Sequence, residues 1–448
     1  MALSGIEIYK LLPRTNCREC KFPTCLAFAM QLAAGKVEIS ACPHISEEAK
    51  AALGEASAPP IRPITIGRGD YALKIGEETV LFRHDKTFEH PTGLAVLIED
   101  TAAPEEINSK LKQLDESQFE RVGLTLRADL VALKNTSGKK ESFLSLVERV
   151  KDTPYGIILM SDDPPIMAAA AEMVKDNKPL LYAATSDNAE AMADVAKTTG
   201  AVLAASAKGL DALSELSDRL SKAGVKDMVL DSAPESISQV LYDQTAIRRL
   251  ALKKRFRSFG FSTIVFPAQL TDDPLKEALY ASIMIEKYAG IVVLSDLAAY
   301  RTFPLLVHRL NIYTDPQRPM TMSQGIYEVN IPTKDSPLII TTNFSLTYFI
   351  VNSEVESSRV PTWLLIMNTE GLSTLTAWSA GKFVPDLIAP FVNKSGIVDK
   401  MANRNLIIPG YVAQIKGELE EELGSDWKVT VGPREASDLP SFLQKLAA

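Results

Sequence analysis

The sequence predicts an α/β protein with three parts: a small N-terminal domain, a (β/α)8 TIM-like barrel and a smaller C-terminal Rossmann-like α/β domain. Three observations support this division. All four cysteines fall within the first 42 residues. Eight short apolar runs then alternate with amphipathic stretches, and four more strand–helix units follow a proline-rich break at 316–319. A chain of 448 residues is long enough for about three domains.

The composition is that of a globular chain with neither a nucleic-acid nor a membrane partner. Hydrophobic residues make up 46% and charged residues 23%, and the formal charge of −8 disfavours binding to nucleic acid or anionic lipid. No apolar run approaches the roughly 20 residues that span a bilayer. The first twelve residues lack a secretory pattern, so we expect a cytoplasmic protein.

The N-terminal domain is expected over residues 1–57. Residues 4–7 read Ser-Gly-Ile-Glu, a capping box that predicts a short helix ended by Pro13. A second helix is expected over 25–34, stopped by Gly35.

A linker and hairpin segment is expected over residues 58–92. Paired prolines among small residues at 55–60 predict the linker. Alternating apolar and polar residues with three glycines at 64–82 predict one or two hairpins.

The barrel is expected over residues 93–315. Buried parallel strands form near-continuous apolar runs, and eight βα units close a barrel. The expected strands are 94–98, 122–126, 156–160, 180–184, 201–205, 228–230, 263–266 and 290–294. Clear helical stretches lie between them at 104–117, 164–176, 188–198 and 210–223. An open, doubly wound sheet is the alternative.

The C-terminal domain is expected over residues 320–448. Its expected strands are 338–342, 363–368, 406–408 and 428–431, and its expected helices are 345–357, 375–392, 412–423 and 436–446. Ligands of such layered sheets bind outside the carboxyl ends of the strands.

The cysteines are spaced Cys-x2-Cys-x4-Cys-x16-Cys, at Cys17, Cys20, Cys25 and Cys42. Four thiolates shielded by apolar neighbours suit a [4Fe–4S] cluster. Phe22, Leu26 and Phe28 are the expected shield, and Cys25 is expected at a helix N-terminus, which stabilises negative charge. A structural zinc site or unliganded thiols are the alternatives, although zinc more often uses two Cys-x2-Cys pairs or histidines.

The C-terminal domain lacks the common cofactor motifs. It has no Gly-x-Gly-x-x-Gly, no Asp-x-His-x-x-Gly, and no histidine at all after His308. It offers polar loops at expected strand ends, at 341–343, 368–374, 409–411 and 432–434. Their hydroxyl and N–H groups could bind a cofactor that bears amides and phosphate, although such loops are often only turns.

Taken together, these features resemble a known family. The segment Cys-Arg-Glu-Cys-Lys-Phe-Pro-Thr-Cys at 17–25, the pair Cys42-Pro43, an eight-unit βα middle and the segment 369–378 occur in that order. The whole chain is similar to the large (gamma) subunit of the corrinoid iron–sulfur proteins of the acetyl-CoA synthase/carbon monoxide dehydrogenase pathway.

The resemblance implies a methyl-group carrier, a cosubstrate more than an independent enzyme. A cobamide on the C-terminal domain, as Co(I), would accept a methyl group from methyltetrahydrofolate through a methyltransferase and pass it to acetyl-CoA synthase. The [4Fe–4S] cluster, supplied by a ferredoxin-type donor, would reduce accidentally formed Co(II). A small barrel subunit would complete a heterodimer. The missing histidine implies that no protein nitrogen binds cobalt, which would ease reduction to Co(I).

The resemblance also implies site residues. The four cysteines match the cluster ligands. The cobamide contacts carried over are Thr341, Leu346, Glu370, Gly371, Leu372, Ser373, Thr374 and Arg434. Thr374 is the residue expected to face the lower side of cobalt, while core packing is the alternative for Leu346.

The role of the barrel is open at this point. Carboxylates at its expected strand ends occupy positions where barrel enzymes keep catalytic groups, although such residues are also common helix caps. They are Glu99, Asp100, Asp162, Asp163, Asp231 and Asp296. A docking or scaffolding role is favoured over an active site.

Three other functions remain possible from the sequence. An iron–sulfur flavoprotein would bind flavin phosphate at Ser373 and Thr374. A folate methyltransferase would work in the barrel. An electron-transfer subunit would hold a cluster and no corrinoid.

Overall fold

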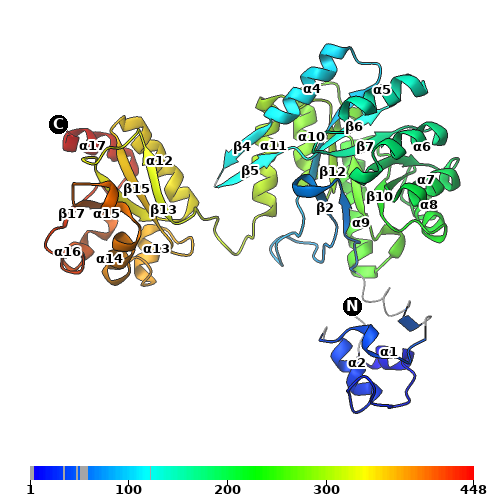
Figure 1. Cartoon of the computed structure of the whole chain (residues 1–448), viewed down its shortest axis with the longest axis horizontal. Helices are drawn as coiled ribbons and strands as arrows, with labels where there is room; N and C mark the ends of the chain where they lie inside the picture. Colours follow the sequence, from blue (N-terminus) through cyan, green and yellow to red (C-terminus); the bar gives the residue numbers. More distant parts are fainter. Residues whose placement is uncertain (1–4, 34–35, 47–48, 51–58, 122, 448) are drawn as a thin grey trace. The chain divides into compact units, whose positions relative to one another are not determined.

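A computed structural model describes residues 5–33, 36–46, 49–50, 59–121 and 123–447 (Figure 1). The chain divides into two compact units. One comprises residues 1–81, 88–114 and 128–305, and the other comprises 82–87, 115–127 and 306–448. Ser4 of the expected capping box, Gly35 and residues 55–58 of the expected linker lie outside the described residues. Within the described ranges, every helix is too short or too polar for a membrane span.

The N-terminal segment is built on two short helices, α1 (Gly5–Leu11) and α2 (Cys25–Ala33), followed by a 3-10 turn, η1 (Ile39–Ala41). The helices pack together around a small apolar cluster that includes Ile8, Leu12 and Phe28.

A hairpin of β1 (Ile64–Ile66) and β2 (Leu73–Ile75) follows, as expected. Its inward residues belong to the same apolar cluster as the barrel interior. Leu73 and Ile66 reach Gly93 and Gly156, which begin two barrel strands. The hairpin therefore closes the amino-terminal end of the barrel.

The barrel is closed by eight parallel strands, which confirms a barrel over an open sheet. The strands are β3 (Gly93–Glu99), β6 (Leu130–Lys134), β7 (Gly156–Met160), β8 (Leu180–Ala184), β9 (Val202–Ser206), β10 (Met228–Asp231), β11 (Ser262–Val265) and β12 (Ile291–Leu294). The helices that follow are α4 (Pro104–Glu116), α5 (Lys140–Val150), α6 (Pro164–Met173), α7 (Ala189–Thr199), α8 (Leu210–Lys222), α9 (Ile237–Lys254), α10 (Pro274–Glu286) and α11 (Ala299–Tyr313).

One expected barrel strand was wrong. Residues 122–126 do not enter the barrel; they fall largely in an antiparallel hairpin of β4 (Gln118–Arg121) and β5 (Leu124–Arg127), and Val122 lies outside the described residues. Gly123, at φ +71°, allows the turn, and Leu124 is 51% exposed. The second barrel strand is β6, whose Leu130–Leu133 stretch is completely buried.

The C-terminal unit holds a five-stranded sheet in the order β13-β15-β14-β16-β17. The strands are β13 (Gly325–Val329), β14 (Leu338–Thr342), β15 (Thr362–Met367), β16 (Asn405–Ile408) and β17 (Lys428–Val431). All pairs are parallel except β13 with β15, and the sequence did not predict the edge strand β13.

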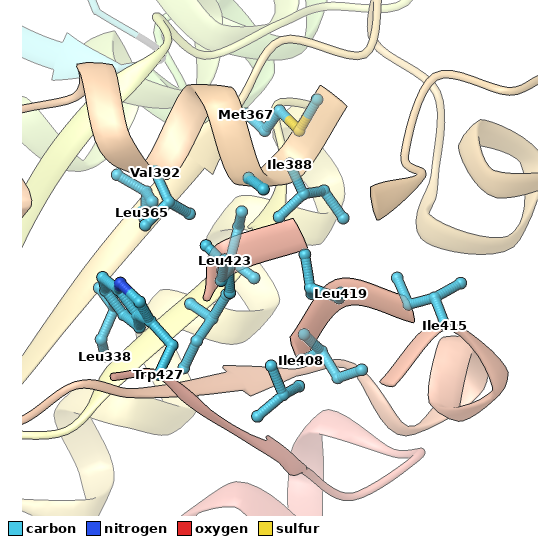
Figure 2. Packing of buried hydrophobic residues seen from close by; sticks show 14 of the residues in the cluster. Leu338, Leu365, Met367, Ile388, Val392, Ile408, Ile415, Leu419, Leu423 and Trp427 are labelled. Atoms are coloured by element: carbon cyan, nitrogen blue, oxygen red, sulfur yellow. The ribbon is translucent and has the colours of Figure 1, made fainter. Parts of the chain in front are cut away.

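Helices cover both faces of this sheet. α12 (Ser345–Ser358) and α17 (Leu439–Ala447) pack on one face. The other face carries α13 (Thr374–Ser379), α14 (Pro385–Lys394), α15 (Ile397–Lys400) and α16 (Lys416–Leu423). Figure 2 shows this second layer, in which Leu419 and Leu423 of α16 pack over Ile408 and Trp427. The single helix expected over 375–392 is two helices, because Gly381, at φ +70°, ends the first and Pro385 begins the second.

Candidate functional site

The four cysteines lie on the loop between α1 and α2, at the start of α2 and directly after η1. Cys17 and Cys20 lie between α1 and α2, Cys25 begins α2, and Cys42 directly follows η1. Every thiol is free, and exposure falls from Cys17, which is exposed, through half-buried Cys20 to Cys25 and Cys42, which are buried.

The backbone around these thiols is wound tightly. Asn16, Arg18 and Lys21 all have positive φ, at +50°, +67° and +66°, and Lys21 N donates to Arg18 O at 2.9 Å. Asn16 N donates to Cys25 Sγ at 3.4 Å, while Asn16 Oδ1 accepts from Cys25 N at 2.8 Å. Asn16 therefore ties the loop to the start of α2 and supplies an N–H donor to a thiol, as iron–sulfur sites use.

An apolar shield is present, but its expected composition was partly wrong. Phe28 is buried, and its ring lies 5.8 Å from that of Phe22. Leu26 is 41% exposed and lies outside the cluster, because it follows Cys25 on the opposite face of α2 from Phe28. Ile8, Leu12 and Ile45 complete the buried wall beside Cys25 and Cys42.

Cys17 has polar neighbours. Its Sγ and one ligand atom each of Glu19 and His44 lie within 4.8 Å of one another. Glu19 and His44 also pair at 2.9 Å. All three side chains are exposed, whereas the other three thiols pack in or against the apolar cluster. Three of the four thiols therefore lie in or against one apolar cluster, while Cys17 lies beside polar groups. By donor type, four soft thiols suit an iron–sulfur cluster.

The C-terminal unit holds a cavity of about 490 Å³ at the carboxyl ends of β14, β16 and β17. β14 connects through α12 to β15 on one side, and β15 then connects back to β16 on the other side of β14. The connections thus reverse between β14 and β16, where parallel α/β sheets open a ligand crevice.

The predicted cofactor contacts divide into two groups around this cavity. Thr341, Ser373, Thr374 and Arg434 line it. Glu370, Gly371 and Leu372 belong to the loop that leads to Ser373 but do not line the cavity.

Leu346 also lies outside the cavity lining, on the first turn of α12, where it is 58% exposed. Its exposure contradicts core packing as its role. Ile350, one turn further along the same helix, does line the cavity and is 46% exposed. With Leu375 (45% exposed) and Tyr411 (41% exposed), it gives the cavity an apolar rim that sequence reasoning missed.

Buried hydroxyls at the end of β14 are unsatisfied. Among the described residues, Thr341 Oγ1, Thr342 Oγ1 and Ser345 Oγ have no hydrogen-bond partner, although all three residues are at most 4% exposed. Of the three, only Thr341 lines the cavity, and because buried polar atoms are normally paired, its hydroxyl indicates a polar ligand or water there.

Polar groups close the far side of the cavity. Tyr411 Oη donates to Glu435 Oε1 at 2.5 Å, and this hydrogen bond raises the pKa of Tyr411. Arg434 also lines the cavity, and its charge lowers the pKa of Tyr411 against the effect of Glu435. A cation and a phenol at the rim suit a ligand with an anionic or amide-bearing arm.

The barrel carboxylates are largely committed to local contacts. Glu99 pairs with Lys134 at 3.3 Å, Asp100 accepts from Ser137 Oγ at 2.6 Å, and Asp163 accepts from Ile166 N to cap α6. Asp296 pairs with Arg301, which also pairs with buried Glu277. Asp162 contributes its backbone carbonyl to Asn188. These contacts are those of caps and structural ion pairs.

Asp231 is the buried member of this set. It accepts hydrogen bonds from Tyr182 Oη at 2.6 Å and Ser206 Oγ at 2.8 Å through one oxygen, and from Ala233 N at 2.8 Å through the other. Burial raises the pKa of Asp231 against these hydrogen bonds, which lower it. Burial, together with the neighbouring Asp231, also raises the pKa of Tyr182.

Comparison with known proteins decides the family. A family model described as CO dehydrogenase/acetyl-CoA synthase delta subunit matches residues 63–443, and one described as putative Fe-S cluster matches residues 12–44. The corrinoid/iron-sulfur protein large subunit of Moorella thermoacetica is 44% identical over 99% of this chain and 98% of its own length. This chain belongs to the corrinoid/iron-sulfur protein large-subunit family. The resemblance stated from the sequence is thereby confirmed.

The family extends to archaeal complexes. The acetyl-CoA decarbonylase/synthase complex gamma subunit of Methanothermobacter thermautotrophicus is 34% identical over 100% of both chains. That of Archaeoglobus fulgidus is 34% identical over 99% of this chain and 98% of its own. The Fe-S match spans all four cysteines. Among solved structures, dihydropteroate synthase from Thermus thermophilus is matched at 15% identity over 56% of this chain and 100% of its own, with a TM-score of 0.38, which supports no inference.

Proposed function

We propose that this chain is a methyl-group carrier of the reductive acetyl-CoA pathway, which holds a [4Fe–4S] cluster and a cobamide. The observation that carries the proposal is the full-length match, at 44% identity, to a corrinoid/iron-sulfur protein large subunit. The thiol set and the cavity described above give each cofactor a place that its chemistry fits. The chain acts as a cosubstrate of the enzymes that load and unload it.

Cys17, Cys20, Cys25 and Cys42 hold the cluster, which supplies low-potential electrons when bound. Asn16 fixes the loop that carries the first two thiols, through its paired hydrogen bonds with Cys25. The buried wall of Ile8, Leu12 and Phe28 keeps water from Cys25 and Cys42, which favours tight ligation by soft sulfur. Exposed Cys17 leaves one side of the site open to an electron donor.

The cobamide belongs to residues 320–448, which form a Rossmann-like domain with its crevice at the reversal point. A bound cobamide supplies a cobalt that accepts and releases a methyl group. The hydroxyl of Thr341, which lines the cavity and lacks a partner among the described residues, suits its amide or phosphate groups. The apolar rim suits the face of the corrin ring. These residues fit the cofactor by their chemistry.

The contacts proposed for the cobamide are those named from the sequence. Thr341, Ser373, Thr374 and Arg434 contact it from the cavity lining, and exposed Leu346 contacts it from α12. The loop that contains Glu370, Gly371 and Leu372 lies against the cobamide. Residues 320–448 contain no histidine, so this domain offers no imidazole to cobalt.

The partners follow from the same role. Relatives are named as a large subunit and as a subunit of a complex, which supports assembly with a small barrel subunit. Methyltetrahydrofolate methyltransferase and acetyl-CoA synthase are the proposed donor and acceptor sides, in the cytoplasm. A ferredoxin-type protein is the proposed reductant. Residues 1–57 form the cluster domain, 58–92 a linker and hairpin, and 93–315 a barrel that serves as scaffold and docking body.

Replacement of Thr374 with His tests the cobamide site. An imidazole at this position would bind cobalt and stabilise Co(II), so the Co(II)/Co(I) midpoint should fall by about 59 mV for each tenfold change in equilibrium constant. Electron paramagnetic resonance should show nitrogen splitting. Ser379→His, at the end of α13 and outside the cavity lining, is the matched control. An unchanged midpoint and spectrum in Thr374→His would place the cobalt elsewhere.

A further inference from the structure

Asn343 occupies the turn between β14 and α12, next to the loop that follows β15. It is only 4% exposed, although it carries one of the most polar side chains. The loop beside it, residues 368–373, leads directly into Ser373 and Thr374 on the cavity wall.

The amide oxygen of Asn343 gathers three donors from this loop. Asn343 Oδ1 accepts from Thr369 N at 2.9 Å, from Gly371 N at 3.0 Å and from Thr369 Oγ1 at 3.2 Å. Beyond Met367 the chain leaves the sheet, so these N–H groups have lost their ladder partners. Asn343 Oδ1 is the acceptor that a neighbouring strand would otherwise supply to Thr369 N and Gly371 N.

The amide nitrogen of Asn343 donates to the same loop and to one further segment, which precedes β13. Asn343 Nδ2 donates to Asn368 Oδ1 at 3.2 Å and to Met322 O at 3.4 Å, and Asn343 O accepts from Met322 N at 2.9 Å. Asn343 therefore joins the end of β14, the loop after β15 and the segment that precedes β13.

The loop needs this support because its backbone is strained. Glu370 and Gly371 both have positive φ, at +56° and +77°, and a non-glycine residue pays to adopt that conformation. A Cβ on Gly371 would lie 2.8 Å from Thr321 Cγ2, so the loop also packs tightly on the segment before β13. Thr369 Oγ1 also lies 3.1 Å from Leu372 O, a second acceptor for its one hydroxyl hydrogen, so this hydroxyl links Asn343 to the residue before Ser373.

We propose that Asn343 is a positioning residue for the cobamide, which fixes the loop 368–373 so that Ser373 and Thr374 are presented to the cofactor. The inference rests on the proposed function and adds to it a residue that touches neither cavity nor cofactor. Removal of the Asn343 amide leaves Thr369 N and Gly371 N buried without an acceptor, and the strained turn then relaxes.

Hydrogen–deuterium exchange on the complete chain without cofactors tests the clamp directly. In Asn343→Ala, the peptide that spans residues 368–374 should exchange roughly tenfold faster or more, because two amides lose their acceptor. Asn343→Asp keeps the acceptor for Thr369 N and Gly371 N but places an oxygen against Met322 O and Asn368 Oδ1, so it should restore only part of the protection. Asn352→Ala removes an amide that bonds only to exposed Glu356 on α12 and should leave the loop unchanged.

The cofactor-loaded protein gives the second readout. Asn343→Ala should bind cobamide more weakly and shift the Co(II)/Co(I) equilibrium, whereas Asn352→Ala should stay close to the parent chain. Unchanged exchange and an unchanged midpoint in Asn343→Ala would overturn the proposal, as would a uniform rise in exchange over the whole sheet. A parent chain that takes up no cobalt while its loop still responds to Asn343→Ala would instead refute the proposed function.

Discussion

Asp231 lies at the carboxyl end of β10, where Tyr182 and Ser206 both donate hydrogen bonds to it. It is 4% exposed, and burial raises its pKa above the ordinary carboxyl value. A buried carboxylate at this end of a barrel strand is the arrangement expected of a catalytic acid. Here its oxygens are occupied by a phenol, a hydroxyl and a backbone N–H, so a structural role accounts for it.

The raised pKa of Asp231 predicts that the free energy of unfolding depends on pH. The folded chain holds this proton more tightly than the unfolded chain, so unfolding releases it. This contribution to the free energy of unfolding therefore falls as the pH rises from the ordinary carboxyl pKa toward the folded value. Asp231→Asn removes the titration, so the variant should gain stability relative to the parent chain as the pH rises.

Chemical unfolding of both chains from pH 4 to pH 8, followed by the barrel's circular dichroism, measures this difference. Its slope should not exceed about 1.4 kcal/mol per pH unit, the limit for one proton. A difference that is constant over the range, or that shifts in favour of the parent chain as the pH rises, would show that burial does not raise this pKa.

For single residues, the sequence predicted the candidate cluster ligands better than it predicted the side chains that pack around them. The candidate ligands could be named because the chain has only four cysteines and all of them lie within residues 17–42. Leu26 was wrongly expected to shield the cluster, because an apolar side chain does not by itself show which face of its helix is buried. Asn343 could not be found, because four of its five side-chain hydrogen bonds go to residues 25 to 28 positions away and depend on the sheet order.

Among the elements, the loops after β16 and β17 approach so closely that one glycine is required. Gly410 N donates to Pro433 O at 3.0 Å, and Gly432 N donates to Ile408 O at 2.9 Å. A Cβ at Gly410 would lie 2.6 Å from Gly432 O. These two loops form one wall of the cavity, and Tyr411 and Arg434 belong to that wall.

Gly410→Ala should therefore destabilise the C-terminal unit by about 1–3 kcal/mol, the usual cost of forced overpacking. Gly417→Ala, on α16, is the matched control, because nothing lies within 4 Å of its added Cβ. It should be neutral or stabilising by up to about 1 kcal/mol. Denaturant unfolding of both variants checks the pair, and equal stabilities would contradict the close approach of the two loops.

The sequence predicted elements well where an apolar run is continuous and poorly where it is marginal. The run at 122–126 was mistaken for a barrel strand because Val, Leu and Leu are separated by residues that a hairpin also favours. β13 was missed because its alternating residues, on an edge strand, are only partly buried. The barrel closure was predicted because the number of βα units, and not the identity of each strand, decides it.

The loop that carries Cys17 and Cys20 is rich in basic residues, whereas the whole chain is acidic. The chain carries a net charge of −8, yet Arg14, Arg18 and Lys21 lie within eight residues of one another beside exposed Cys17. Arg14 is held against Tyr9, and the nearby Glu19 pairs with His44. Arg18 and Lys21 are exposed, and no ion pair involves them within the described ranges. This surface suits an acidic electron donor.

The double variant Arg18→Glu, Lys21→Glu should slow reduction of the cluster by an acidic ferredoxin roughly tenfold or more at low salt, since steering depends on complementary charge. The difference should shrink at about 0.5 M salt. Lys253→Glu, Lys254→Glu on α9 makes the same change in net charge far from the cysteines in the sequence and should leave the rate unchanged. Stopped-flow reduction measures all three, and equal slowing by both double variants would rule out a local docking surface.

The central claim is that one chain carries both cofactors, and metal analysis of the complete protein, purified without oxygen, tests it most directly. We expect about four iron atoms, as one [4Fe–4S] cluster, together with about one cobalt in a corrinoid per chain. Iron without cobalt would contradict it and leave an electron-transfer subunit, and flavin absorbance in place of cobalt would identify an iron–sulfur flavoprotein.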